Sequence, residues 1–261
     1  MPMKGLLRNF VRQHLPTRIK DHRILSGPLK GRRIVTSWRD YPAAVLGITE
    51  KELVGWFSAE VGAGETWLDV GAHYGYTAIA LSSLVGRSGR VYAFEPIAAT
   101  AGCISRTRIL NGMAWLSVVP TALGDCRDQE WLTLRTVRGM ADSVLDAETT
   151  GDGVQGLPEG FLVSRFDWLW ERITGADRRV HGVKIDVQGM EYHVLRGMEE
   201  LLKLQHPKLV IEFHKGVDRG EILSFLETVG YDRVAFAIED AEVKVAQTLE
   251  DDRSYAFNRA V

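Results

Sequence analysis

From residue 66 onward, short apolar runs alternate with stretches in which apolar residues recur at helical spacing. The runs 66–70, 90–95, 113–120, 180–187 and 207–214 are typical of buried strands. The stretches between them predict helices at 75–85, 97–111, 166–173, 190–204 and 219–229. Strands that alternate with helices form a mostly parallel sheet with helices on both faces, so the pattern predicts an α/β fold.

The last part of the chain departs from this alternation. The runs 232–238 and 254–261 have strand character and no helix between them, which predicts an antiparallel hairpin at the C-terminal side of the sheet. The run 130–137 predicts a weaker strand. The following stretch, 138–160, is rich in Gly, Asp and Thr and predicts a long loop, either a mobile surface loop or a lid over a substrate.

The first 49 residues are expected to form an extension, and residues 50–261 the main domain. Turn signals at Gly27, Pro28 and Gly31 predict a β-hairpin over residues 24–38, and a helix is expected over 50–61. Residues 1–33 carry nine basic side chains against the single acid Asp21. A basic amphipathic helix there would make peripheral contact with an anionic membrane or a partner; a frayed, solvated helix is the alternative.

Composition narrows the classes of function. The 261 residues carry a formal net charge of -2, so the molecule as a whole is not suited to bind nucleic acid. The two cysteines fit neither a zinc site nor a disulfide framework, and we expect a reducing, cytoplasmic setting.

The junction after the first strand of the alternating series predicts a ligand site. Gly71 would let the backbone approach a ligand, Gly75 would begin the helix, and His73 lies between them. Asp69, at the strand end, is placed to accept from a ligand ammonium group. Glu95 ends the next strand, where both carboxylate oxygens can accept from the hydroxyls of a ribose. The pair of strand ends predicts a cofactor that carries a nucleoside.

The glycine turn favours S-adenosylmethionine over a dinucleotide. In the fingerprint G-x-G-x-x-G, backbone donors surround a pyrophosphate. Here His73 and Tyr76 occupy the second and third glycine positions, and the acid Asp69 would repel phosphate. An NAD(P)-dependent oxidoreductase on a similar sheet remains the alternative.

Several segments together resemble the FkbM family of S-adenosylmethionine-dependent methyltransferases. The segments are LDVGAHYGYTA (68–78), FEP (94–96), ALGD (122–125), VKIDVQGMEYHVLRGM (183–198) and LVIEFH (209–214). The resemblance covers roughly residues 24–238. It implies a class I methyltransferase (Rossmann-like) fold and O-methylation of a hydroxyl on a sugar or natural product. It also implies that Glu50 orients the methionine end of the cofactor and that Asp125 lies near the adenine. Gln188 stands where this family usually has glutamate.

Methyl transfer to a hydroxyl needs a group that removes its proton. The candidates at the strand ends are Asp186, Glu212 and His214, and Glu212 and His214 are two residues apart, on one face of a strand. Asp186 as a helix cap and Glu212 as an ion-pair partner of Lys184 are the structural alternatives. Mg²⁺ held by Asp186 and Glu212 is a further variant. The acceptor is expected to be a small molecule or a glycan, and a cofactor-binding module without turnover is the other possibility.

Overall fold

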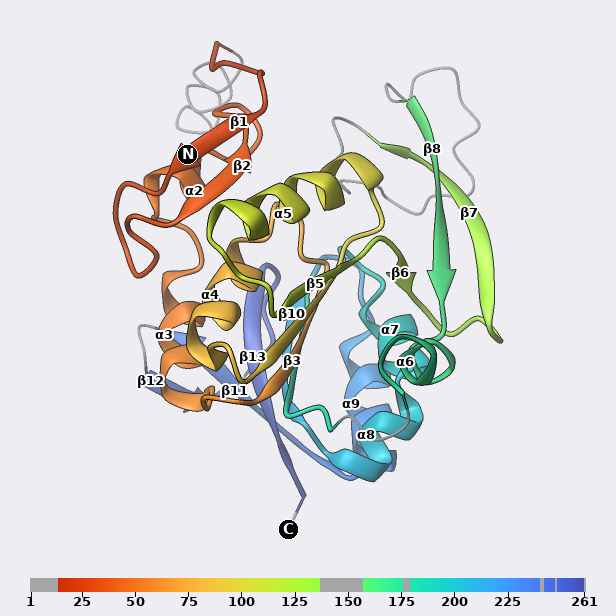
Figure 1. Cartoon of the computed structure of the whole chain (residues 1–261). Coiled ribbons are helices and arrows are strands. Elements are labelled where there is room, and N and C mark those ends of the chain that lie inside the picture. The colour runs from red at the N-terminus through yellow and green to blue at the C-terminus, as the bar shows by residue number, and fades with distance from the viewer. Residues whose placement is uncertain (1–13, 137–156, 176–178, 240–241, 247, 261) are drawn as a thin grey trace.

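The computed structural model describes residues 14–136, 157–175, 179–239, 242–246 and 248–260 (Figure 1). Every helix in these ranges is too short or too polar to span a bilayer. Residues 1–13 lie outside the described part, and so does most of the basic amphipathic helix expected there.

An eight-stranded sheet forms the centre of the molecule, with the strand order β12-β11-β13-β10-β9-β3-β4-β5. The strands are β3 (Thr66–Val70), β4 (Arg90–Phe94), β5 (Leu116–Val119), β9 (Gly182–Ile185), β10 (Lys208–Phe213), β11 (Tyr231–Glu239), β12 (Glu242–Val245) and β13 (Arg253–Arg259). From β5 to β10 all neighbours pair in parallel, whereas β13 is antiparallel to both β10 and β11. The predicted mostly parallel α/β sheet with a C-terminal antiparallel hairpin is therefore confirmed.

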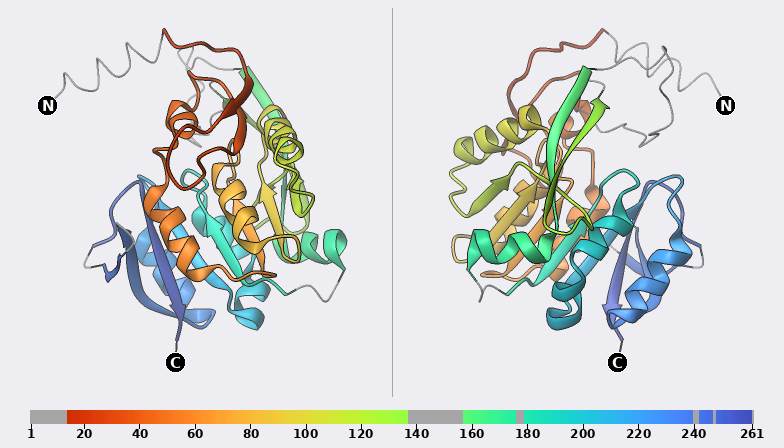
Figure 2. Two further views of the ribbon diagram at one scale, coloured as in Figure 1. Left: turned by 60° about the vertical axis from the view of Figure 1, so that its left-hand side comes forward. Right: turned by 90° about the vertical axis from the view of Figure 1, so that its right-hand side faces the viewer.

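Helices cover both faces of this sheet (Figures 1 and 2). One face carries α3 (Lys51–Glu60), α4 (Tyr76–Val85) and α5 (Ala98–Leu110), and the other carries α6 (Phe166–Thr174), α7 (Glu191–Gly197), α8 (Glu199–Gln205) and α9 (Arg219–Thr228). Successive strand residues point to opposite faces. Accordingly Leu68 and Val70 belong to the core under α6–α9, whereas Trp67 belongs to the core under α3–α5.

Local sequence explains where two of these helices lie and begin. α4 consists almost entirely of apolar and small residues and is buried along nearly its whole length, as expected for a helix enclosed between a sheet and another helix. α9 begins after Asp218, whose side chain accepts from the backbone N–H of Glu221 and so caps the helix.

The N-terminal region differs from its prediction. The hairpin consists of β1 (Lys20–Arg23) and β2 (Arg33–Thr36), so its first strand lies before the apolar run that suggested it. Ile24 and Leu29 are buried in the loop between the strands, because an apolar pattern reports burial and not conformation. The short helix α2 (Pro42–Leu46) was not predicted. The backbone N–H of Val35 donates to the hydroxyl of Thr107 at 2.9 Å, which ties this region to helix α5.

A small second sheet projects from the domain (Figure 2). It contains β6 (Ala122–Leu123), β7 (Gln129–Thr136) and β8 (Leu157–Ser164) in the order β6-β8-β7. The predicted strand at 130–137 is thus present. The loop predicted over 138–160 is wrong for 157–160, which pair with β7 as part of β8, and residues 137–156 lie outside the described residues.

The single helix predicted over 190–204 is divided into α7 and α8. At the junction Met198 leaves the helical conformation, with φ -109° and ψ 13°. The preceding Gly197 lies against the backbone of Gly124, where an added Cβ atom would be 2.1 Å from the carbonyl oxygen. This close approach needs glycine and brings α7 against the segment after β6.

Candidate active site

The carboxyl ends of four parallel strands meet at one edge of the central sheet. β3 pairs with both β4 and β9, and β9 pairs with β10, so the residues that follow these strands are neighbours. Ligands of open α/β sheets bind at this edge. Most of the residues singled out from the sequence lie here.

The turn after β3 is pressed against the chain that follows β9. Gly71 has φ +77°, and a Cβ atom on it would lie 1.8 Å from the carbonyl oxygen of Asp186. Gly75, with φ +83°, precedes the first residue of α4. His73 has φ +50°, an unusual conformation for a residue with a side chain, and its ring lies 5.0 Å from that of Tyr41. The turn therefore has the tight backbone geometry that the glycines predicted.

Asp69 is fully buried beneath this turn. Its Oδ2 atom accepts from the hydroxyl of Thr77 at 2.7 Å, and its Oδ1 atom lies 3.4 Å from Nζ of Lys184. These contacts fix the start of α4 to β9. A contact between Asp69 and a ligand ammonium stays a prediction.

Lys184 is a buried cation at the centre of the site. Besides Asp69, its Nζ atom lies 3.1 Å from Oδ2 of Asp186 and donates to the carbonyl of Gly71 at 3.3 Å. Burial alone would lower the pKa of Lys184, but the charges of Asp186 and Asp69 outweigh it and raise the pKa. The ion pair that the sequence suggested between Lys184 and Glu212 is instead formed with Asp186 and Asp69.

Glu95, at the end of β4, is also buried. Its Oε2 atom accepts from the backbone N–H of His73 at 2.9 Å, and its Oε1 atom accepts from that of Ile97 at 3.0 Å. Burial raises the pKa of Glu95 to about 7, although these two hydrogen bonds favour the charged form. Each oxygen keeps a second lone pair, so the carboxylate can still accept from a diol.

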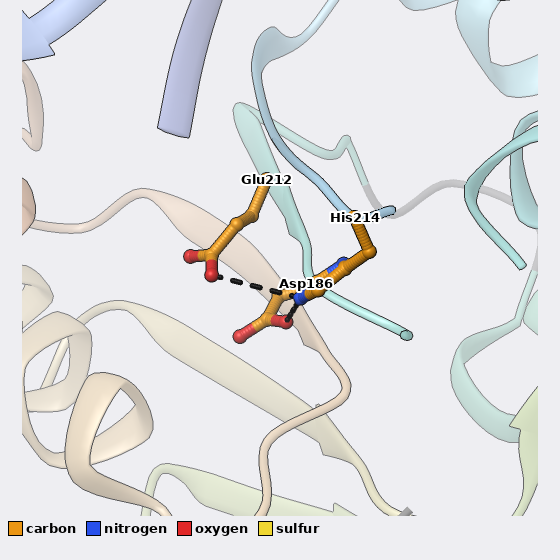
Figure 3. Close-up of side chains that lie close together, drawn as sticks. All are labelled: Asp186, Glu212 and His214. Carbon is orange, nitrogen blue, oxygen red and sulfur yellow. Dashed lines mark ion pairs between the residues drawn. The ribbon is translucent and has the colours of Figure 1, made fainter. Parts of the chain in front are cut away.

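Asp186, Glu212 and His214 come together as predicted (Figure 3). His214 Nε2 lies 3.5 Å from Oδ1 of Asp186 and 3.7 Å from Oε1 of Glu212. Burial, followed by the charges of Asp186 and Glu50, raises the pKa of Glu212 to about 7. Burial opposes protonation of His214, but the hydrogen bond that its ring donates to Glu191 and the charges of the nearby carboxylates raise its pKa. Glu212 and His214 can therefore exchange a proton, with the carboxylate of Asp186 beside them.

The same three side chains offer one ligand atom each within 4.8 Å of one another. They are of the types that bind divalent cations. The ammonium of Lys184 already pairs with Asp186 at 3.1 Å, however, so a divalent cation bound through that carboxylate would have to compete with it. We therefore interpret the group as one for proton transfer.

Glu50 approaches this group from the start of α3. It has φ +51°, and burial raises its pKa, which Lys184 partly offsets. Tyr41, from the N-terminal extension, lies nearby; burial and then the charge of Glu50 raise its pKa. Glu50 lines the acidic side of the site, and Tyr41 packs against the ring of His73, so the N-terminal region lies against the site.

Asp125 lies apart from this group, after β6. Its Oδ1 atom is 3.0 Å from Nδ1 of His193 on α7, and both side chains are almost half exposed. A contact between Asp125 and adenine stays a prediction.

The sequence reasoning missed two functional candidates. Lys184 was considered only as a partner for Glu212, although a lysine within an apolar strand signals a buried cation that needs counter-charges. From the sequence, Glu191 is an acid in the first turn of the helix predicted over 190–204, a position that the helix dipole alone would explain. In the structure it is fully buried, and its Oε1 atom lies 2.7 Å from Nδ1 of His214.

A cavity of about 440 Å³ adjoins the cluster. Its lining is mostly polar and comes from α3, the end of β10, and the segments around β11 and β13. The lining residues are Glu50, Glu52, Leu53, Glu212, Ile238, Asp252, Arg253 and Ser254. Glu212 belongs to both the cluster and the cavity wall, so a molecule in the cavity would lie beside the proton-transfer group.

Comparison with known proteins finds a family match for this chain. The sequence matches the family described as the methyltransferase FkbM domain over residues 69–233. A comparison with curated protein sequences found no match.

Among solved structures, the chain is similar to a methyltransferase FkbM from Methylobacillus flagellatus (17% identity, TM-score 0.47, 74% of this chain and 43% of that one). It thus spans less than half the length of that relative. It is also similar to an S-adenosylmethionine-dependent O-methyltransferase from Thermotoga maritima (12% identity, TM-score 0.48, 97% of this chain and 81% of that one). A third similar structure is the fibrillarin of Aeropyrum pernix with natively bound S-adenosylmethionine (13% identity, TM-score 0.49, 92% of this chain and 87% of that one). All three likenesses are distant.

Proposed function

The chain belongs to the FkbM methyltransferase family, and from this premise we propose that it methylates a hydroxyl oxygen of a sugar or another natural product. Its cofactor is S-adenosylmethionine. The observation that carries the proposal is the cluster of Asp186, Glu212 and His214 beside a polar cavity, next to a turn suited to a nucleoside cofactor.

The residues at the ends of β3 and β4 fit the cofactor. Gly71 and Gly75 give the turn its tight backbone path, and Glu95 presents a carboxylate with lone pairs left for the two ribose hydroxyls. The carboxylates around Glu50 and Asp186 suit the positive charge of a sulfonium and an ammonium group. When bound, S-adenosylmethionine supplies an electrophilic methyl group on a positively charged sulfur.

We assign to His214 the role of the base that removes the proton of the acceptor hydroxyl. Its Nε2 atom faces the carboxylates of Asp186 and Glu212, which stabilise the imidazolium that forms when the ring takes a proton. Glu212, with a pKa of about 7, can pass that proton on toward the cavity. Lys184 holds Asp186 in place through their 3.1 Å contact.

We place the acceptor in the polar cavity. The carboxylates of Glu52, Glu212 and Asp252 accept hydrogen bonds from hydroxyls, and Arg253 and Ser254 can donate to hydroxyl oxygens. An acceptor with several hydroxyl groups matches this lining better than an apolar one. The small-molecule or glycan acceptor expected from the sequence is part of this proposal.

Transfer of labelled methyl groups from S-adenosylmethionine to a panel of hydroxylated sugars and polyketides tests the proposal. His214→Gln is expected to slow transfer by about 10²- to 10⁴-fold while calorimetry shows unchanged cofactor affinity. Added EDTA is expected to leave the rate unchanged. Binding of NAD without any response to S-adenosylmethionine would support the oxidoreductase, and cofactor binding without transfer to any acceptor would support a non-catalytic module.

A further inference from the structure

We propose that Glu191 and Gln188 are positioning residues that fix the tautomer and orientation of His214. Glu191 keeps a proton on Nδ1 of the ring. Gln188 contacts Nε2 at the position that the acceptor hydroxyl would occupy. The inference rests on the proposed function, in which His214 is the base, but its geometry stands on its own.

Glu191 fixes one side of the imidazole ring. Its Oε1 atom lies 2.7 Å from Nδ1 of His214 and also accepts from the backbone N–H of Gly189 at 3.1 Å. The side chain is fully buried at the first residue of α7. A carboxylate can only accept, so Nδ1 carries the proton, and Nε2 of the neutral ring is a hydrogen-bond acceptor.

Gln188 contacts the other side of the ring. Its Nε2 atom lies 2.8 Å from Nε2 of His214. The amide nitrogen donates and the ring nitrogen accepts, which agrees with a proton on Nδ1. Gln188 has φ +55°, a conformation that costs energy in a residue with a side chain and that clusters at functional sites.

An amide at position 188 suits a histidine that gains and loses a proton. Its NH₂ group donates to the neutral ring, and after rotation its oxygen accepts from the protonated ring. A glutamate, which the resemblance leads one to expect here, could only accept and would favour the protonated ring. Gln188 therefore keeps His214 available as a base. This effect would explain why glutamine stands where the family usually has glutamate.

Proton transfer then follows from the positions of the charged groups. The acceptor hydroxyl takes the place of the Gln188 amide, its O–H bond breaks, and an N–H bond forms at Nε2 of His214 while the electron pair stays on the oxygen. Three carboxylates face the resulting imidazolium: Glu191 at Nδ1, and Asp186 and Glu212 at 3.5 Å and 3.7 Å from Nε2. They balance its charge in the transfer step.

Nitrogen chemical shifts of ¹⁵N-labelled histidine test the tautomer without any ligand. At a pH where the wild-type ring is neutral, the shift of Nδ1 is expected to be that of a protonated nitrogen and the shift of Nε2 that of an unprotonated one. The signals of His214 are identified as those that disappear in His214→Gln. Glu191→Gln is expected to mix the two tautomers, and Gln188→Glu to keep the ring doubly protonated to higher pH. Glu199→Gln is the matched control, because Glu199 is also the first residue of a helix but pairs with Lys203.

A neutral wild-type ring with its proton on Nε2, or a Glu191→Gln spectrum identical to that of Glu199→Gln, would overturn the inference. With an acceptor found in the panel, Glu191→Gln is expected to lower kcat by about 10- to 100-fold without raising KM for the cofactor. Gln188→Glu is expected to move the acidic limb of the pH–rate profile upward. If the tautomer is as expected but no acceptor is methylated, the proposed function fails and the positioning inference stands. If methylation proceeds and Glu191→Gln behaves like the control, only the positioning inference fails.

Discussion

The two ends of the site differ in how their charges are matched. At the β3–β4 end, the buried carboxylate of Asp69 pairs with Thr77 and Lys184, and that of Glu95 accepts from two backbone N–H groups. At the β9–β10 end, Asp186, Glu212 and Glu50 crowd around the single ammonium of Lys184, and the pKa of Glu212 rises to about 7. The first end is preorganised by the fold, whereas the second holds negative charge that a ligand can complete.

The largest expected effect lies where the two ends touch. In Gly71→Ala the new Cβ atom would lie 1.8 Å from the carbonyl oxygen of Asp186, and neither backbone can easily move. We expect a loss of more than about 4 kcal/mol in the free energy of unfolding, or no folded protein, measured by denaturant titration.

Gly86→Ala is the control for this change. Gly86 also has a positive φ, +66°, but no atom lies within 4 Å of its added Cβ position. With ψ -170° as well, Gly86 lies in a region used almost only by glycine, so its cost should be limited to a conformational term of about 1–3 kcal/mol. Equal losses in the free energy of unfolding of the two variants would show that the contact between Gly71 and Asp186 does not stabilise the fold.

Removing the shared cation should have the next largest effect. Lys184→Met leaves Asp69 and Asp186 buried or partly buried without their counter-charge, and we expect a loss of about 3–5 kcal/mol in the free energy of unfolding. Lys208→Met is the control: that ammonium is well exposed and pairs with Glu60, so about 0–1 kcal/mol is expected. A Lys184→Met protein as stable as the control would contradict the view that one cation joins the two ends.

The smallest expected effect is the pH dependence of cofactor binding at the preorganised end. Burial raises the pKa of Glu95 to about 7, so the ionised form that accepts from ribose becomes dominant above that pH. Calorimetry should show the affinity for S-adenosylmethionine rising by about tenfold between pH 6 and 8, the scale of one charge-assisted hydrogen bond. The neutral carboxyl stabilises the unliganded fold fully below the unfolded pKa, and that contribution is lost as the pH rises through about 7.

Glu95→Gln should remove most of this pH dependence, since glutamine does not ionise. If the wild-type affinity is flat over the same range while the variant binds equally well, Glu95 does not contact the cofactor. That outcome would contradict the view that the preorganised β3–β4 end binds the cofactor through Glu95.

The sequence predicts the central sheet well, because strands buried on both faces are nearly continuous apolar runs bounded by turn residues. It fails where burial occurs without regular structure, as in the loop that contains Ile24 and Leu29. It also fails for β8, whose N-terminal half has a loop-like composition and is ordered by pairing with β7.

The candidate site was predictable only in part, for a related reason. Spacing along strands brings Glu212 and His214 together, and parallel pairing brings Asp186 to them. The contact between Glu191 and His214 joins a helix to a strand end 23 residues away and depends on how α7 packs on the sheet. The full burial of Asp69 likewise depends on the three-dimensional position of Lys184, which no local pattern reveals.

The position of β13 has a consequence for how the protein is made. β13 lies between β10 and β11 although it follows both in the chain, and Ser254 at its start donates to Glu212 at 3.3 Å. A nascent chain leaving the ribosome can therefore assemble β3, β4 and β9 early, while the wall beside Glu212 forms only after β13 has emerged. The ends of β3 and β4 can thus be in place before the wall beside Glu212 is complete.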